Sequence, residues 1–238
     1  MKGFPPVFLS LLLLANWSSI CAFSPEKRFR RPVALAWTGG DLLAVANRDA
    51  GSVSLVDVGK RKVVGETVVG QRLTDLASLP GGRLLLATDE EASELLLLET
   101  NGSGVTVRDR VTTPHSPVSV AVATDGSFVT VASLWARRVS LFRIDSERGE
   151  LRKERVTDLP FPPRRQWMDV AGERLVLADA FADKVVALRL PDLHLVSTRT
   201  LSGHNVGDLT LAPNGSDLLF SHQVLNPLVP TTRSRVFW

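Results

Sequence analysis

The sequence has very little cysteine, since Cys21 is the only one among its 238 residues. A signal-peptidase cut after Ala22, just behind a short apolar run, would remove it. The remaining chain would then have no disulfide framework, no cysteine-based zinc site, no thiol nucleophile and no C-x-x-C-H haem attachment. An exported protein without disulfides fits a bacterial envelope better than a small, disulfide-stapled secreted domain.

Recognisable catalytic motifs are also missing. The sequence has no G-x-S-x-G nucleophile elbow, no H-E-x-x-H pair and no phosphate-binding loop. Charge of one sign is not in excess either, because 28 basic and 25 acidic residues give a net charge of only +3. Basic and acidic residues are interspersed, so the chain lacks the basic patch that nucleic-acid binding requires. We therefore predict no catalytic residue in this chain and no nucleic-acid partner.

The first residues have the pattern of a targeting segment. Lys2 supplies a positive start and residues 8–15 a short apolar run, so we assign 1–22 to a signal peptide and 23–31 to a basic linker. Lipid attachment at the cysteine is disfavoured, because the preceding Ile20 is larger than the usual attachment motif accepts. The prediction is an exported protein of the periplasm or cell envelope, or an extracellular one, that is membrane-adjacent at most.

A repeat of about 43 residues organises the rest of the chain. Glycines separated by 42, 44, 46 and 43 residues are each followed by a short apolar strand that ends in small or polar residues. These glycines are Gly40, Gly82, Gly126, Gly172 and Gly215. Glycine-bearing turns between strands are typical of tight hairpins, where the backbone needs a positive φ.

Each repeat predicts four strands. One apolar strand precedes the glycine and one follows it; a third has apolar residues two apart, and a fourth is more polar. Four antiparallel strands at this period describe one blade of a β-propeller, with the polar strand outermost. A solenoid is the alternative, but its repeats are usually shorter or helical. The predicted fold is an all-β propeller of four-stranded antiparallel blades over residues 32–222, about four and a half blades.

The repeat unit PHSPVSVAVATDGSFVTVAS, with its partner PVALAWTGGDLLAVAN, resembles the YVTN-type β-propeller family. Many rings of that family have seven blades, so the resemblance implies that this chain forms an incomplete ring. Residues 223–238 lose the alternation and contain Pro227 and Pro230, which cannot join a central ladder. We expect this segment to be an insertion or a truncated end. It is similar to the interruption in bacterial envelope propellers fused to a cytochrome c domain, which implies haem beyond Trp238 and none within this chain.

Ligands of propellers bind where loops converge at one end of the axis. The loops between blades and those between second and third strands should share that end. The candidate binding residues for a ligand, a protein partner or a fused domain are Arg72, His115, Arg164, Arg165, His204, His222 and Gln223. Five further polar residues of these loops are Arg48, Asp89, Glu90, Arg138 and Asp183.

Three functions remain open at this stage. The first is a non-catalytic binding scaffold, and the second is the propeller part of a haem-dependent redox protein. The third is a metal-dependent hydrolase or lactonase, in which Asn47, Asp89 and Asp179 at equivalent positions would hold calcium. Ser133 and His222 fill the same position in the other two repeats and weaken that constellation, so no metal ligand is assigned.

Overall fold

The computed structural model describes residues 29–169, 171–201, 203–213 and 217–223. The predicted signal peptide and nearly all of segment 223–238 lie outside the described residues. The described chain contains strands and no helix, and so no helix long and apolar enough to cross a membrane.

Four sheets of four antiparallel strands are followed by a two-stranded sheet, which confirms the predicted all-β fold of about four and a half blades. The sheets are β1 (Pro32–Trp37), β2 (Leu42–Asn47), β3 (Ser52–Asp57), β4 (Lys62–Val68); β5 (Leu73–Ser78), β6 (Leu84–Asp89), β7 (Glu94–Thr100), β8 (Val105–Thr112); β9 (Pro117–Val122), β10 (Phe128–Ser133), β11 (Arg138–Asp145), β12 (Glu150–Asp158); β13 (Pro163–Met168), β14 (Arg174–Asp179), β15 (Lys184–Arg189), β16 (His194–Thr200); and β17 (Leu209–Leu211), β18 (Leu218–Phe220). Within each sheet the strands follow one another in chain order.

The turn glycines have the backbone conformation that the repeat predicts. Gly40, Gly82, Gly126 and Gly172 all have positive φ, between 56° and 73°, and each lies in the turn between the first and second strand of its sheet. This conformation is accessible to glycine without strain, which explains its regular spacing. Gly215 lies outside the described residues.

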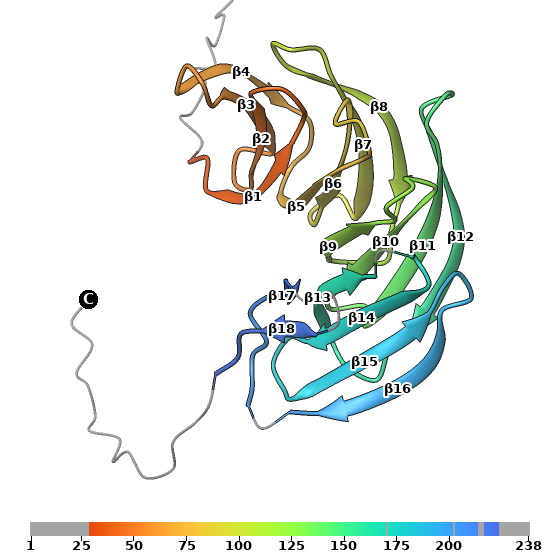
Figure 1. Cartoon of the computed structure of the whole chain (residues 1–238). Helices are drawn as coiled ribbons and strands as arrows, with labels where there is room; N and C mark the ends of the chain where they lie inside the picture. Colours follow the sequence, from red (N-terminus) through yellow and green to blue (C-terminus); the bar gives the residue numbers. More distant parts are fainter. Residues whose placement is uncertain (1–28, 170, 202, 214–216, 224–238) are drawn as a thin grey trace, which may run out of the picture.

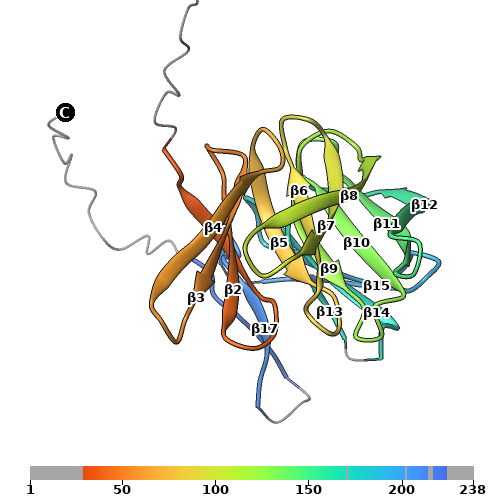
Figure 2. The same ribbon diagram turned by 90° about the horizontal axis from the view of Figure 1, so that it is seen from above.

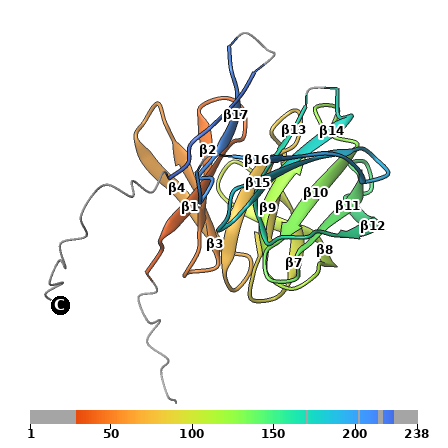
Figure 3. The same ribbon diagram turned by 90° about the horizontal axis from the view of Figure 1, so that it is seen from below.

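The sheets are arranged as blades around a common axis. The first strands β1, β5, β9, β13 and β17 contact one another in that order and line the inside of the arc (Figure 1). The fourth strands lie outermost and alternate between exposed and partly buried residues, or are exposed throughout in β16. Views turned by 90° show the connections gathered at the two ends of the strands (Figure 2 and Figure 3).

One apolar cluster fills each interface between blades. The middle strands are buried on both sides, as the run Leu95–Leu98 of β7 illustrates: Leu96 and Leu98 pack toward the first blade, while Leu95 and Leu97 pack toward the third. Because successive side chains of a strand point to opposite faces, a continuous apolar run belongs in a sheet covered on both faces. The described end of the predicted linker is attached to this framework, because Arg30 forms an ion pair with Glu66 at 2.8 Å.

Candidate functional site

The end of the propeller on which the candidate residues were expected, called here the loop face, is built from two sets of connections. One set joins the fourth strand of a blade to the first strand of the next, at 69–72, 113–116, 159–162 and 201–208 without residue 202. The other joins second to third strands, at 48–51, 90–93, 134–137 and 180–183. In antiparallel sheets with this strand order, both sets fall at the same end.

Most of the predicted residues lie on this face, but four belong to strands: Arg164 and Arg165 lie within β13, Asp89 is the last residue of β6, and Arg138 is the first residue of β11. Arg72, His115 and His204 are exposed on the connections between blades. Arg164 and Arg165 were expected on such a connection and are instead the second and third residues of β13. The expectation was wrong because a register shift between Pro163 and Arg165 lets the strand start earlier than alternation alone indicates.

Charged side chains tie neighbouring loops together in the first two blades. Arg48 forms an ion pair with Glu90 of the next blade, and Glu90 also accepts a hydrogen bond from Ser116 Oγ at 3.0 Å. Arg72 pairs with Glu91 at 3.5 Å, and both side chains are about half exposed. Exposed pairs of this kind contribute little to stability, about 0–1 kcal/mol. These residues give the first half of the loop face a polar surface.

The three residues considered as calcium ligands are engaged with their own loops. Asp89 accepts hydrogen bonds from the backbone amides of Gln71 and Arg72 at 2.6 and 3.1 Å and of Ala92 at 3.2 Å. Asp179 accepts from Phe181 and Ala182 at 3.0 and 3.2 Å. Asn47 donates to two serine hydroxyls. Within the described ranges, no group of three His, Cys, Asp or Glu side chains is placed to hold a metal ion.

The histidines at the end of the described chain form a local arrangement. His204 pairs through its backbone with Gln223, and the side chain of Gln223 accepts a hydrogen bond from Asn205 at 2.8 Å. The His222 ring lies 5.5 Å from the Phe220 ring and packs so closely on Gly203 that a Cβ there would be 1.8 Å from its Nδ1. His222 Nδ1 is buried and has no hydrogen-bond partner in the described part of the chain. The arrangement brings His204, His222 and Gln223 together and leaves His115 apart on another loop.

Two aromatic rings on loops of the third and fourth blades lie beside an arginine of β13. The sequence predicted the arginine as a binding residue but not the two rings. The Trp135 and Phe181 rings stack with centroids 5.6 Å apart and planes at 23°, and the Arg164 guanidinium lies 5.5 Å from the Phe181 ring centroid. Trp135 is 59% and Phe181 46% exposed. We call these three residues the aromatic–arginine cluster.

Trp135 and Phe181 both stand nine residues after their turn glycine, a position that holds Asp49 and Glu91 in the first two blades. Alignment of the repeats at that position could have found them.

Near the axis, Asp75 of β5 bridges two blades. Its carboxylate accepts hydrogen bonds at 2.9 Å from its neighbour Leu76 N and from Val120 N of β9. Burial raises the pKa of Asp75 above its ordinary value of 3.8, although the two amides and the charge of Arg165 oppose the shift. Arg165 itself donates from Nε to the carbonyl oxygen of Gly207 at 2.9 Å.

This pKa shift predicts a pH-dependent contribution to stability. Below about pH 3.8 the carboxyl is protonated in both states; above it the unfolded chain ionises first. The free energy of unfolding that Asp75 contributes therefore falls as pH rises through its raised folded pKa. Urea unfolding from about pH 3 to about pH 7 should show that wild type loses stability relative to Asp75→Asn over this range. A difference that is the same at every pH would contradict the assignment.

Comparison with known proteins finds similarity of structure without similarity to a sequence family. No family model matches the chain, and no curated protein matches its sequence significantly. Among solved structures, hydrazine synthase of Kuenenia stuttgartiensis superposes with a TM-score of 0.74 at 21% identity, over 89% of this chain and 61% of that one. The periplasmic gluconolactonase of Pseudomonas aeruginosa gives 0.69 at 19% identity, over 81% and 63%. A proposed 6-phosphogluconolactonase of Bacteroides fragilis gives 0.66 at 16% identity, over 81% and 64%.

The chain folds as a β-propeller. At identities this low, the superpositions establish a shared fold and give no information on the chemistry of this chain. This chain spans less than two thirds of the length of each of these three proteins. The predicted membership of the YVTN-type family stays a prediction, as do the signal peptide and the haem domain beyond Trp238.

Proposed function

We propose that this chain is the binding module of an exported propeller protein and that it docks a protein partner with an acidic surface on the aromatic–arginine cluster. The observation that carries the proposal is the exposure of Trp135 and Phe181 on adjoining loops, stacked on each other and beside Arg164. Tryptophan and arginine are enriched among the residues that dominate binding energy in protein interfaces. Tryptophan buries a large apolar area, and the planar guanidinium of arginine both stacks on rings and donates several hydrogen bonds.

The charges around the cluster favour an acidic partner. Arg164 has no acidic ion-pair partner among the described residues, and neither has Arg137 of the Trp135 loop or Lys184, which follows the Phe181 loop. These three cations outnumber Asp183, the acidic residue of the two loops. Arg138 is already paired with Asp158 at 2.7 Å. An unpaired arginine stacked on a ring keeps the edge of its guanidinium free for a carboxylate, which it can bind through two hydrogen bonds.

The redox and hydrolase alternatives rest on other parts of the chain. The redox role depends on a domain that would follow Trp238. The hydrolase role would use Asp89 and Asp179, whose carboxylates hold loop amides. A binding role uses side chains that stay largely exposed although they stack on one another, so it fits the described residues better.

Site-specific photo-crosslinking in the native host tests the proposal. A photoreactive residue at position 181 should capture a discrete protein that the same residue at Leu195 does not capture; Leu195 is a matched exposed apolar position on the outer strand β16. The purified partner should then bind Trp135→Ala and Arg164→Ala about tenfold more weakly than wild type, and the Arg164→Ala complex should respond less to added salt.

The controls distinguish a specific interface from nonspecific hydrophobic binding. Leu195→Ala should bind the purified partner as wild type does. Equal crosslinking from both positions, or unchanged affinity of the Trp135 and Arg164 variants, would contradict the proposal.

A further inference from the structure

A groove lies on the outer part of the third blade, beside the connection that enters this blade from the second. It has a volume of about 470 Å³, which is within the range of ligand sites in proteins. Two of its lining residues belong to the connection and four to β11 and β12. The six are Thr113, Pro114, Arg138, Lys153, Val156 and Asp158. We call this feature the rim groove.

The register of the third blade places the lining on one face of its sheet. The three lining residues of β12 pair with alternate residues of β11. These pairs are Lys153 with Phe142, Val156 with Ser140, and Asp158 with Arg138. Paired side chains share a face of a sheet, and Phe142 packs in the cluster between the second and third blades. The lining residues of β11 and β12 are therefore directed toward the second blade.

Lys153 brings to the groove a charge that has no acidic ion-pair partner among the described residues. Its Nζ donates to Thr112 Oγ1 at 3.3 Å and lies 5.9 Å from the centroid of the Phe142 ring. Because an ammonium group has three donors, these contacts hold its position and leave donors for a ligand. Arg138 and Asp158 pair at 2.7 Å and balance each other, so the lining has an excess of positive charge. Val156, which is 41% exposed, adds an apolar surface.

The rim groove is separated from the aromatic–arginine cluster by a single loop. Loop 134–137 carries Trp135 and leads directly into Arg138 of the groove. Arg164 lies on the fourth-blade side of this loop, Arg137 within it, and Lys153 on the second-blade side. None of these three cations has an acidic ion-pair partner among the described residues. A surface with cations at three successive points is complementary to an acidic segment.

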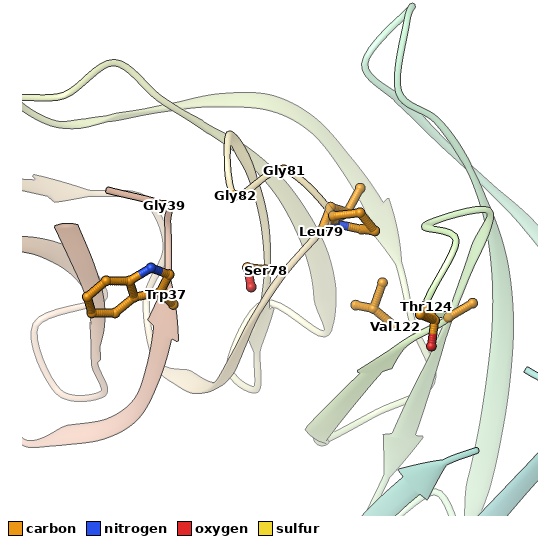
Figure 4. A pocket seen from close by; sticks show the side chains of 10 residues that line it. Trp37, Gly39, Ser78, Leu79, Gly81, Gly82, Val122 and Thr124 are labelled. Carbon is orange, nitrogen blue, oxygen red and sulfur yellow. The ribbon is translucent and has the colours of Figure 1, made fainter. Parts of the chain in front are cut away.

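The cavity between the turns of the first three blades, at the other end of the strands, has no comparable charge. Its volume is about 540 Å³, and none of its ten lining residues is charged. Trp37 belongs to the face of β1 that carries the exposed Leu35, opposite the alanines that pack on the second blade. Figure 4 accordingly shows its ring directed away from Ser78 and Thr124. No described blade precedes β1, so the exposure of this ring has a structural cause and indicates no ligand.

We infer that the rim groove binds an acidic segment of the same protein partner that docks on the aromatic–arginine cluster. The inference rests on the proposed function and adds that the acidic surface of the partner reaches past loop 134–137 into the groove. A carboxylate of the segment would pair with Lys153, and an apolar side chain next to it would contact Val156. A basic segment would meet like charge there and would be excluded.

Photo-crosslinking from position 156, in parallel with position 181, tests this inference in the native host. Both positions should capture the same protein. Mass spectrometry of the product from position 156 should place the crosslink in a segment rich in Asp and Glu. With the purified partner, an excess of octaglutamate should suppress capture at position 156, whereas octalysine should not.

Substitutions of Lys153 measure its contribution to the affinity for the purified partner. Lys153→Ala should weaken binding about fivefold, and Lys153→Arg should stay within about twofold of wild type because the charge is kept. Arg155→Ala is the matched control. Arg155 is an exposed cation of the same strand without an acidic ion-pair partner among the described residues, but it pairs with Leu141, which packs toward the fourth blade. Its removal should leave the affinity unchanged, and thermal unfolding of the three variants checks that each is folded.

The possible outcomes separate this inference from the proposed function. Capture at position 181 alone, different proteins at the two positions, or a crosslinked segment without acidic residues would overturn the inference and leave the cluster site standing. Equal effects of Lys153→Ala and Arg155→Ala would do the same. Capture at position 156 alone would contradict docking on the cluster and the shared partner, and capture at neither position would overturn both proposals.

Discussion

Replacing Asp89 by alanine is expected to lower the free energy of unfolding by about 3 kcal/mol. The carboxylate is fully buried at the end of β6 and accepts three backbone hydrogen bonds, two from the connection to the preceding blade and one from its own loop. Truncation would leave those amide donors without their acceptor at a partly buried site, and the loss of hydrogen bonds to a charged group is among the costlier single changes. Urea unfolding of wild type and variant measures the difference directly.

Equivalent positions in other blades provide a graded control. Asp179 accepts two amide hydrogen bonds, so Asp179→Ala should cost about 2 kcal/mol. Ser133 donates a single hydrogen bond to the Pro114 carbonyl at 3.0 Å, so Ser133→Ala should cost about 1 kcal/mol. An equal or inverted order would show that these hydrogen bonds do not set the stability of the loops. If Asp89 held a metal instead, a chelator would lower the melting temperature of wild type and leave the Asp89→Ala variant unaffected.

The repeat made the fold predictable from sequence because one physical requirement recurs in every blade. A tight turn needs positive φ, so glycine marks the same place in each blade, and the apolar strands can be counted from it. Burial on both faces of the middle strands then requires apolar runs such as Leu95–Leu98, whose period alone does not show which residue packs against which blade.

The direction of individual side chains near the site was harder to predict. Each fully four-stranded blade has a register shift near the start of its first strand, for example between Leu73 and Asp75 and between Pro163 and Arg165. A bulge inverts the alternation of side chains, so counting from the glycine misplaces the residues before it. This is why Arg164 and Arg165 were assigned to a loop. After the glycine the second and third strands pair without a register shift, so Trp135 and Phe181, which lie between these strands, were recoverable by counting.

The candidate residues were chosen mainly among histidines and charged side chains, so the two rings of the aromatic–arginine cluster were not among them. Histidines attract a functional interpretation because they titrate and bind metals, but His222 is packed against Gly203 of its own blade. Two exposed aromatic rings stacked on adjoining loops are the more informative signal, because aromatic side chains are enriched where protein partners bind. The sequence alone cannot separate an exposed ring from a buried one when both stand in apolar surroundings.

The third blade contains one buried and one exposed aromatic ring, so the contributions of the two rings to the free energy of unfolding can be compared. Phe142 of β11 is fully buried at the interface between the second and third blades, in the same cluster as Leu97 and Val129. Phe142→Ala is expected to lower the free energy of unfolding by about 4 kcal/mol, because it removes apolar contacts and leaves a cavity that the strands of two blades cannot fill. Phe142→Leu should cost about 1–2 kcal/mol, since most of the volume is kept.

Trp135→Ala should change the free energy of unfolding by less than about 1 kcal/mol, because the exposed ring loses only its stacking contact with Phe181. Denaturant unfolding of both alanine variants under identical conditions compares the two rings. A loss at Trp135 as large as that at Phe142 would mean that the loop ring supports the fold, and the argument for partner binding through it would lose its basis. A small loss combined with weakened partner binding would identify Trp135 as a residue that is retained for what it contacts outside the chain.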